Sequence, residues 1–210
     1  AGAGKSTVAR LVAEELGYAY IDTGAMYRAG TLKMINSGTP FSPEAVGRIA
    51  RNIHISFKPD GKVNRVFADG LEITEAIRST AVTDAVSKVA ALGAVREAMV
   101  AQQRRLGQEG NVVLDGRDIG TVVFPQAGCK IFLTASVAER ARRRYEELKA
   151  KGQPVDLEQI KHDIEVRDKK DSERALAPLK QAEDAVLVDT SAMTVTQVVA
   201  AILKLVRERQ

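Results

Sequence analysis

Several kinds of residue are scarce in this 210-residue chain, and each scarcity excludes a class of protein. The single cysteine, Cys129, has no partner for an internal disulfide and is typical of a reducing compartment, so we expect a cytoplasmic protein. Aromatic residues make up 4% of the chain and tryptophan is absent, which disfavours a surface built on base stacking. No apolar run approaches the roughly 18 residues of a membrane span, so we expect no membrane partner.

What is present is ordinary for a globular protein, with 45% hydrophobic and 28% charged residues. The net charge of +4 could indicate a nucleic-acid partner, but basic and acidic residues are interleaved almost throughout. This pattern favours a small phosphorylated substrate over a polynucleotide. Nucleic-acid binding stays an alternative, and it would predict a steep loss of affinity with salt.

Short apolar runs, three of them ending in an acid, alternate with helical patterns. The runs lie at 18–22, 111–115, 129–135 and 185–189, and the first helix is expected at 6–16. Capping boxes at Ser136 to Glu139 and at Thr194 to Gln197 predict the starts of two later helices. Unbroken apolar runs are typical of strands covered by helices on both faces. The sequence therefore predicts an α/β fold with a parallel sheet.

The segment 37–106 interrupts this rhythm. A helix is expected after Ser42, followed by three short alternating runs separated by turn residues, which predict a small antiparallel sheet. A helical stretch follows at about 82–105, with a break expected at Gly93. We interpret the whole segment as an inserted subdomain.

The opening letters AGAGKST contain the second half of a phosphate-binding loop, G-x-x-x-x-G-K-[ST]. Backbone N–H groups at a helix start, with Lys5 beside them, would form an anion site, and Ser6 would supply a ligand to Mg²⁺. The first glycine of the pattern would fall two residues before Ala1, so we expect the chain to lack its first strand. Glycine-rich turns before helices are common, and an accidental match is the alternative.

Acids also follow two predicted strands, at Asp22 and at Asp115 to Asp118. Ligands of open parallel sheets collect beyond the carboxyl ends of strands, where such acids can hold Mg²⁺. The alternative is that these acids only form turns and hold no ligand. A turn does not require an arginine beside Asp118, so the pair Arg117 and Asp118 favours a functional site over a simple turn.

Two basic segments complete the candidates. A helix expected at 156–174 places Arg167, Asp171 and Arg174 at i, i+4 and i+7, where two guanidinium groups could clamp a phosphate. A solvated salt-bridged face is the alternative. The basic stretch 140–155 predicts either a mobile lid over polyphosphate or an ordinary exposed helix.

Three motifs occur together in order: DTGAMYR at 22–28, LDGRDIGTVVFP at 114–125, and the RD…DSER…APL pattern at 167–179. This combination resembles the bacterial cytidylate kinase family of P-loop nucleoside monophosphate kinases, which phosphorylate CMP and dCMP from ATP. The resemblance runs along essentially the whole chain. It implies a three-layer P-loop fold with its core at 1–36, 107–139 and 156–210, a nucleoside-monophosphate-binding insert at 37–106 and a lid at 140–155. It also implies that the absent first strand is the central one of five, so we expect the 210-residue chain to need a longer N-terminus for stability.

The resemblance further implies roles for individual residues. ATP would be held by Gly2, Ala3, Gly4, Lys5, Ser6, Thr7 and the lid residue Arg143, and Mg²⁺ by Ser6 and Asp115. CMP or dCMP would be held by Asp22, Thr23, Arg28, Ser87, Arg96, Arg117, Asp118, Arg167, Asp171 and Arg174, of which Ser87, Arg96 and Asp118 would read cytosine. Lys5, Arg28, Arg167 and Arg174 would act directly on the transferring or accepting phosphate. We expect a monomer with no nucleic-acid partner.

Two rival interpretations remain at this point. One is another small P-loop kinase that acts on UMP, AMP or a small phosphate-free metabolite. The other is a nucleotide-binding module that transfers nothing.

Overall fold

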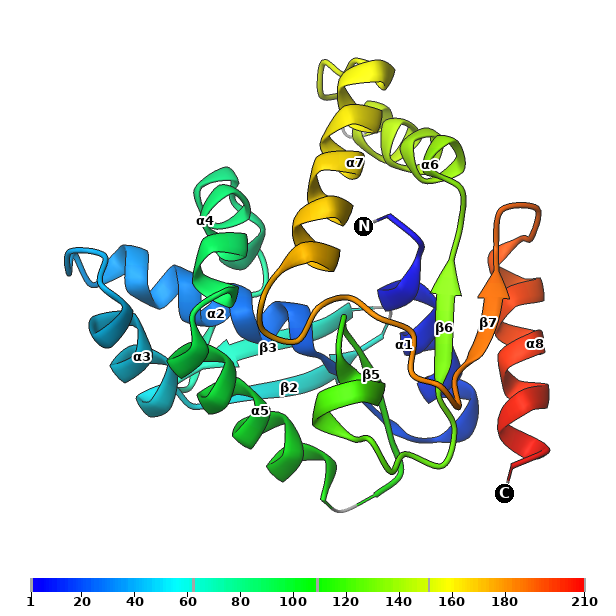
Figure 1. Cartoon of the computed structure of the whole chain (residues 1–210), viewed down its shortest axis with the longest axis horizontal. Helices are drawn as coiled ribbons and strands as arrows, with labels where there is room; N and C mark the ends of the chain where they lie inside the picture. The colour runs from blue at the N-terminus through cyan, green and yellow to red at the C-terminus, as the bar shows by residue number, and fades with distance from the viewer. Residues whose placement is uncertain (1, 62, 109, 151, 210) are drawn as a thin grey trace. The chain divides into compact units, whose positions relative to one another are not determined.

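The computed structural model describes residues 2–61, 63–108, 110–150 and 152–209, and the chain divides into two compact units (Figure 1). One unit consists of Ala1–Leu16 and Arg117–Gln210, and we call it the donor unit because it contains the glycine-rich sequence expected to hold the phosphoryl donor. The other consists of Gly17–Gly116, and we call it the middle unit. Each is described by itself.

The middle unit begins with a parallel strand pair. Strands β1 (Ala19–Asp22) and β5 (Val112–Asp115) run side by side with Asp22 opposite Asp115. Helix α2 (Thr23–Asn36) follows β1 without a loop, because the Asp22 side chain accepts a hydrogen bond from the Ala25 N–H at 2.9 Å and caps the helix. Both strands and their direction agree with the prediction from the sequence.

The remainder of the middle unit contains the predicted antiparallel sheet. Its strands are β2 (Ile55–Asp60), β3 (Val63–Ala68) and β4 (Leu71–Glu72), in that order. The helices are α3 (Pro43–Asn52), the 3₁₀ turn η1 (Ala76–Arg78), α4 (Thr80–Ala90) and α5 (Gly93–Gly107). The helical stretch is broken immediately before Gly93, as the sequence predicted.

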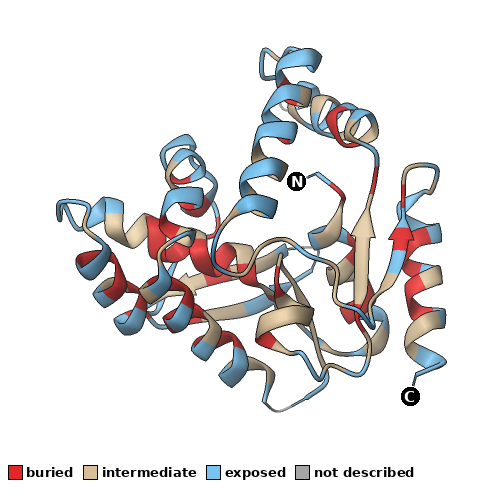
Figure 2. Cartoon of the chain, in the orientation of Figure 1, coloured by how far each residue is buried: buried red, intermediate tan, exposed pale blue. Residues whose placement is uncertain are grey.

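The core of the middle unit lies among its helices and the antiparallel sheet. Met26 of α2 and Met99 of α5 are fully buried, and they belong to one cluster with Val46, Ile55 and Ile77. Figure 2 shows the buried residues along α2, α3 and α5. This packing gives α2 and α5 a rigid base, and both carry predicted site residues.

The donor unit has its own parallel strand pair, β6 (Ile131–Thr134) with β7 (Val186–Asp189). Its helices are α1 (Lys5–Leu16), α6 (Val137–Ala150), α7 (Leu157–Glu173) and α8 (Val195–Arg207), with a π turn η2 at Ile119–Val123. Helix α1 packs on α8, and α6 packs on α7. Thr194 and Gln197 form the predicted capping box of α8.

The fold is therefore of the predicted class, with parallel strands flanked by helices. Among the described residues the parallel strands form two separate pairs, one in each unit. The division into core, insert and lid stays a prediction.

Candidate active site

A cleft of about 840 Å³ lies within the donor unit, between the glycine-rich loop, α6 and the segment after β7. Its described lining includes six cationic side chains and two acidic ones: Lys5, Arg117, Arg142, Arg143, Arg144 and Arg167, with Glu139 and Glu147. We call this cleft the donor pocket. Its excess of positive charge suits a polyphosphate anion.

The glycine-rich loop is built for close approach to an anion. Gly2 and Gly4 both have φ of +76°, in the left-handed region that favours glycine. The Val8 N–H donates to the Gly4 carbonyl at 3.0 Å, so α1 begins directly after the loop with Lys5 and Ser6 in its first turn. A helix start of this kind presents N–H groups and a positive dipole end to a phosphate.

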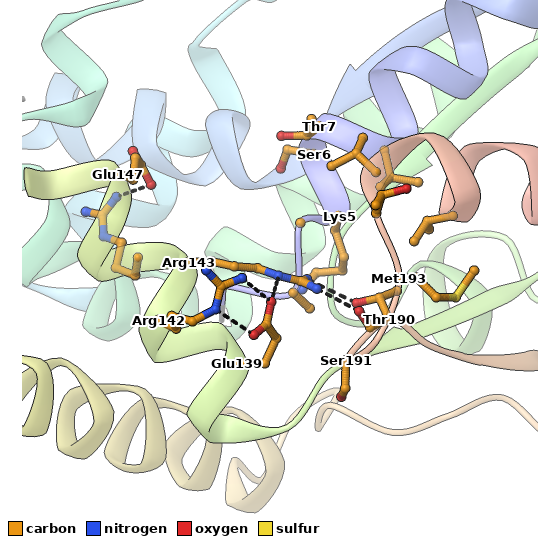
Figure 3. A pocket seen from close by; sticks show the side chains of 18 of the residues that line it. Lys5, Ser6, Thr7, Glu139, Arg142, Arg143, Glu147, Thr190, Ser191 and Met193 are labelled. Carbon is orange, nitrogen blue, oxygen red and sulfur yellow. Dashed lines mark hydrogen bonds and ion pairs between the residues drawn. The ribbon is translucent and has the colours of Figure 1, made fainter. Parts of the chain in front are cut away.

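Helix α6 brings three arginines into the donor pocket, and one acid, Glu139, binds two of them (Figure 3). Glu139 accepts hydrogen bonds from Arg142 Nε at 2.9 Å, Arg142 Nη2 at 2.8 Å and Arg143 Nε at 2.8 Å. The terminal nitrogens of Arg143 donate to Thr190, at 3.1 Å to Oγ1 and 2.6 Å to the carbonyl. The hydrogen bonds from Arg142 and then Arg143 lower the pKa of Glu139 to about 2, so the acid is ionised at neutral pH.

The capping box expected at the start of α6 is only half formed, because the Glu139 side chain binds the arginines instead. The Glu139 N–H donates to Ser136 Oγ at 3.2 Å, which is the first half of the motif. The Ser136 N–H, however, donates to Ser191 Oγ at 2.8 Å, while the Glu139 side chain turns to the arginines. Glu139 and Thr190 are thus pocket residues that the sequence interpretation missed, although the i+3 and i+4 arginines were a readable signal for Glu139.

Arg140, the first residue of the predicted lid, is buried and is therefore not an exposed arginine. Its side chain is buried, donates from Nε to the Ala135 carbonyl at 3.0 Å and pairs with Asp168 of α7 at 2.5 Å. A Cβ added to Gly2 would lie 3.2 Å from Arg140 Cβ, so α6 supports the phosphate loop from behind. Lys151, counted in the basic stretch, lies outside the described residues.

The loop after β5 and the end of α7 form two ion pairs within the donor unit. Arg117 Nε lies 3.1 Å from Asp171 Oδ2, and Arg174 Nη2 lies 4.0 Å from Asp118 Oδ1. Arg167 Nε is buried without a hydrogen-bond partner, and burial, together with nearby Arg117, lowers the pKa of its guanidinium. The structure therefore brings together all five of these predicted residues.

The predicted helical face of these residues is wrong in one detail. Helix α7 ends at Glu173, and Arg174 is its C-cap with ψ of 140°. Only Arg167 and Asp171 therefore share a helical face. Arg174 is held instead by a bond from its Nε to the Ala177 carbonyl at 2.5 Å, where the chain leaves the helix.

In the middle unit, Arg28 and Arg96 are fixed by their own neighbours. Arg28 Nη1 donates to the Ile77 carbonyl at 3.2 Å and to Thr83 Oγ1 at 3.0 Å. The Arg96 side chain is 6% exposed, with its guanidinium 5.6 Å from the centre of the Tyr27 ring. Ser87 is exposed on α4, which packs against α5.

The strand ends of the middle unit carry Asp22, Thr23 and Asp115. Thr23 Oγ1 donates to the Asp115 carbonyl at 2.6 Å, and the Tyr20 hydroxyl donates to Asp115 Oδ1 at 3.0 Å. Asp22 caps α2, as described above. The structure thus gives Asp115 a fixed orientation through Tyr20, a residue that sequence reasoning did not single out.

The donor set expected for Mg²⁺ consists of oxygen atoms, as that ion requires. Asp115 offers a carboxylate in the middle unit and Ser6 a hydroxyl in the donor unit. Among the described residues, no three acidic, histidine or cysteine side chains are grouped so that they could hold a metal ion by themselves. The available groups therefore suit an ion that keeps most of its waters and arrives with substrate phosphates.

Within the described ranges, no helix is both long and apolar enough to cross a membrane.

Comparison with known proteins gives the family. The family model described as cytidylate kinase matches residues 1–208. A cytidylate kinase of Limosilactobacillus reuteri (strain DSM 20016) is 53% identical over 212 residues, covering 100% of this chain and 93% of the relative. One of Pediococcus pentosaceus is 52% identical, covering 98% and 92%, and one of Geobacillus thermodenitrificans is 53% identical, covering 100% and 94%. The chain belongs to the cytidylate kinase family.

Proposed function

We propose that this protein transfers the γ-phosphoryl group of ATP to CMP or dCMP and releases ADP with CDP or dCDP. The observation that carries the proposal is the donor pocket, in which a glycine-rich helix start and Lys5 face a group of arginines. Family membership supplies the acceptor class.

Three parts of the donor pocket would bind ATP. The loop 2–7 and Lys5 would hold the β- and γ-phosphates, since N–H groups and an ammonium converge there. Arg143, tied to Thr190, marks the side of the pocket nearest the segment after β7. Met193, Val195 and Val198 supply apolar lining on that segment, which suits the adenine ring.

The acceptor nucleotide would be recognised by charge and by its base edge. Arg28, Arg117, Arg167 and Arg174 would offset the charge of the acceptor phosphate, and Thr23 and Asp171 would hold the sugar region. Cytosine offers an amino donor that suits the buried Asp118 carboxylate, and Arg96 and Ser87 would donate to its acceptors. Uracil has a carbonyl at that position and would leave the carboxylate unpaired, a mismatch worth roughly 10⁴-fold in discrimination.

The reaction requires placement and charge neutralisation more than proton transfer. An oxygen of the acceptor phosphate is already an anion, and it forms a bond to the γ-phosphorus from the side opposite ADP. The bond from that phosphorus to the bridging oxygen breaks, and the oxygen keeps the electron pair. Lys5 and the pocket arginines would stabilise the charge that spreads over the transferring group.

Mg²⁺ would be held by Ser6 and Asp115 together with the phosphates of ATP, and when bound it neutralises phosphate charge. Tyr20 would keep the Asp115 carboxylate in one orientation, as outer-shell partners of metal ligands do.

We also propose that the enzyme works as a monomer in the cytoplasm, with small molecules as its partners. The interleaving of acids with bases supports small-molecule partners over a nucleic acid, because no face is expected to be uniformly basic. Size-exclusion chromatography with light scattering checks the oligomeric state, and a stable dimer would contradict it.

Steady-state ADP release with ATP and Mg²⁺ tests the function. The full-length protein is offered CMP, dCMP, UMP and AMP separately. We expect kcat/KM to be highest with CMP or dCMP. Equal or faster turnover with UMP or AMP would assign the protein to another monophosphate, and binding of ATP with no transfer to any acceptor would indicate a binding module.

A further inference from the structure

Glu139 is placed where it interacts with the groups that would bind phosphate. It lies in the first turn of α6 and lines the donor pocket, and 18% of its side chain is exposed. Both of its oxygens accept hydrogen bonds from Arg142, and one also accepts from Arg143. Figure 3 shows its carboxylate between the two guanidinium groups.

These contacts use the donors that an arginine offers to a phosphate. Arg142 binds Glu139 through Nε and Nη2, which form the parallel pair that also suits two phosphate oxygens. Arg143 gives Nε to Glu139 and its two terminal nitrogens to Thr190. A triphosphate that takes the same donors must therefore displace the carboxylate.

We propose that Glu139 competes with the donor triphosphate for Arg142 and Arg143 and thereby weakens nucleotide binding, an inference that rests on the proposed function. Its carboxylate leaves the arginines as ATP binds and returns as ADP departs. The benefit is in turnover: a pocket with six cationic side chains would otherwise hold ADP tightly, and product release limits turnover in many enzymes.

The alternative is a purely structural role, in which Glu139 only stabilises α6. An acid in a first helical turn is favourable there, and i+3 and i+4 arginines add to it. That role would leave nucleotide affinity unchanged or reduce it through disorder. Competition predicts the opposite sign, because removing the acid frees both arginines for phosphate.

The test is the affinity for ATP of Glu139→Gln, measured by calorimetry with the full-length protein. The amide keeps the size of the side chain and removes its charge. We expect binding about 2- to 5-fold tighter than in the wild type, the range that ion pairs of this exposure support. The control is Glu158→Gln, which removes one charge from an exposed site on α7 that does not line the pocket, and its ATP affinity should match the wild type.

A second probe separates phosphate binding from base binding. Adenosine lacks phosphates, so Glu139→Gln and the wild type should bind it equally. In steady state the variant should show a lower KM for ATP with no gain in kcat. If Glu139→Gln bound adenosine more tightly than the wild type does, by the same factor as ATP, that result would contradict competition for phosphate.

The outcomes distinguish the two proposals. A wild type that does not bind ATP would overturn the proposed function itself. A wild type that binds, with a variant of equal or weaker affinity, would overturn only the role of Glu139. If Glu139→Gln fails to fold, Glu139→Asp serves instead, because its shorter carboxylate cannot reach both arginines; ATP affinity should rise less, and no rise would contradict the inference.

Discussion

At the scale of single residues, several charged side chains at the donor pocket are held by a specific partner. Glu139 holds two arginines, Asp171 holds Arg117, and Arg167 keeps a buried Nε without a hydrogen-bond partner. A buried guanidinium nitrogen left in this way is costly unless a ligand uses it. The pattern supports an anion as the ligand of this unit.

Lys5→Met should lower kcat about 10²- to 10³-fold, because one preorganised positive group is lost from the transferring phosphate. Stopped-time assays of CDP formation measure this change. Lys204→Met, which alters an exposed lysine of α8, is the matched control and should behave as the wild type. An unchanged kcat/KM in the Lys5 variant would remove this lysine from the reaction.

Asp118→Asn should reduce the preference for CMP over UMP at least about tenfold, since an amide can pair with either base edge. Asp118 is buried beside Arg174, so the carboxylate proposed to read the base is shielded from solvent. Competition assays with both acceptors give the ratio of kcat/KM. Asp163→Asn on the exposed side of α7 is the control, and an unchanged ratio in the Asp118 variant would make the base-reading assignment wrong.

At the scale of elements, sequence patterns predicted what depends on neighbours along the chain. The positions of the strands, the antiparallel sheet, the break before Gly93 and the capping box of α8 all follow from local apolar periodicity and turn chemistry. The prediction that Arg174 lies on the helical face was wrong because α7 ends at Glu173. Beyond that end, Arg174 Nε donates to the Ala177 carbonyl. Glu139 was misread because Ser191, which lies far along the chain, takes its place at the Ser136 N–H.

The glycine-rich loop offers a test at this scale. Gly4 has φ of +76°, and a Cβ there would meet no protein atom within 4 Å. Gly4→Ala should lower the free energy of unfolding by about 1–2 kcal/mol from the left-handed backbone alone. It should also weaken ATP binding at least about tenfold, because the methyl group would take up space that the phosphate needs.

Gly38→Ala is the matched control. Gly38 has φ of +63° and equally open surroundings, but it follows α2 in the middle unit. Denaturant titration should show a similar loss of stability, whereas calorimetry should show unchanged ATP affinity. Equal losses of ATP affinity in both variants would mean that the Gly4 effect comes from stability and not from phosphate contact.

At the scale of the whole molecule, the proposed reaction needs residues from both units. The donor unit carries the pocket and the cluster around Arg167, and the middle unit carries Arg28, Arg96 and Asp115. Sequence motifs identified these residues along the chain, but spacing alone could not show which of them share a unit. Because both units carry residues proposed for the acceptor, the substrate that each residue serves must be tested residue by residue.

Arg28→Ala should leave the Kd for ATP within about twofold of the wild type and lower kcat/KM for CMP about 10²-fold, because it removes a positive charge from the acceptor phosphate. Calorimetry and steady-state kinetics on the same preparation separate the two effects. Arg78→Ala, an exposed arginine of the same unit, is the control. A parallel loss of ATP affinity in the Arg28 variant would contradict its assignment to the acceptor.

The most direct test of the central claim follows the phosphoryl group itself. ATP labelled at the γ-phosphate is mixed with the full-length protein, Mg²⁺ and CMP or dCMP, and the products are separated. We predict that the label appears in CDP or dCDP, in amounts equal to the ADP formed. Label found only in inorganic phosphate, or remaining in ATP while CMP is bound, would contradict phosphoryl transfer to cytidine monophosphates.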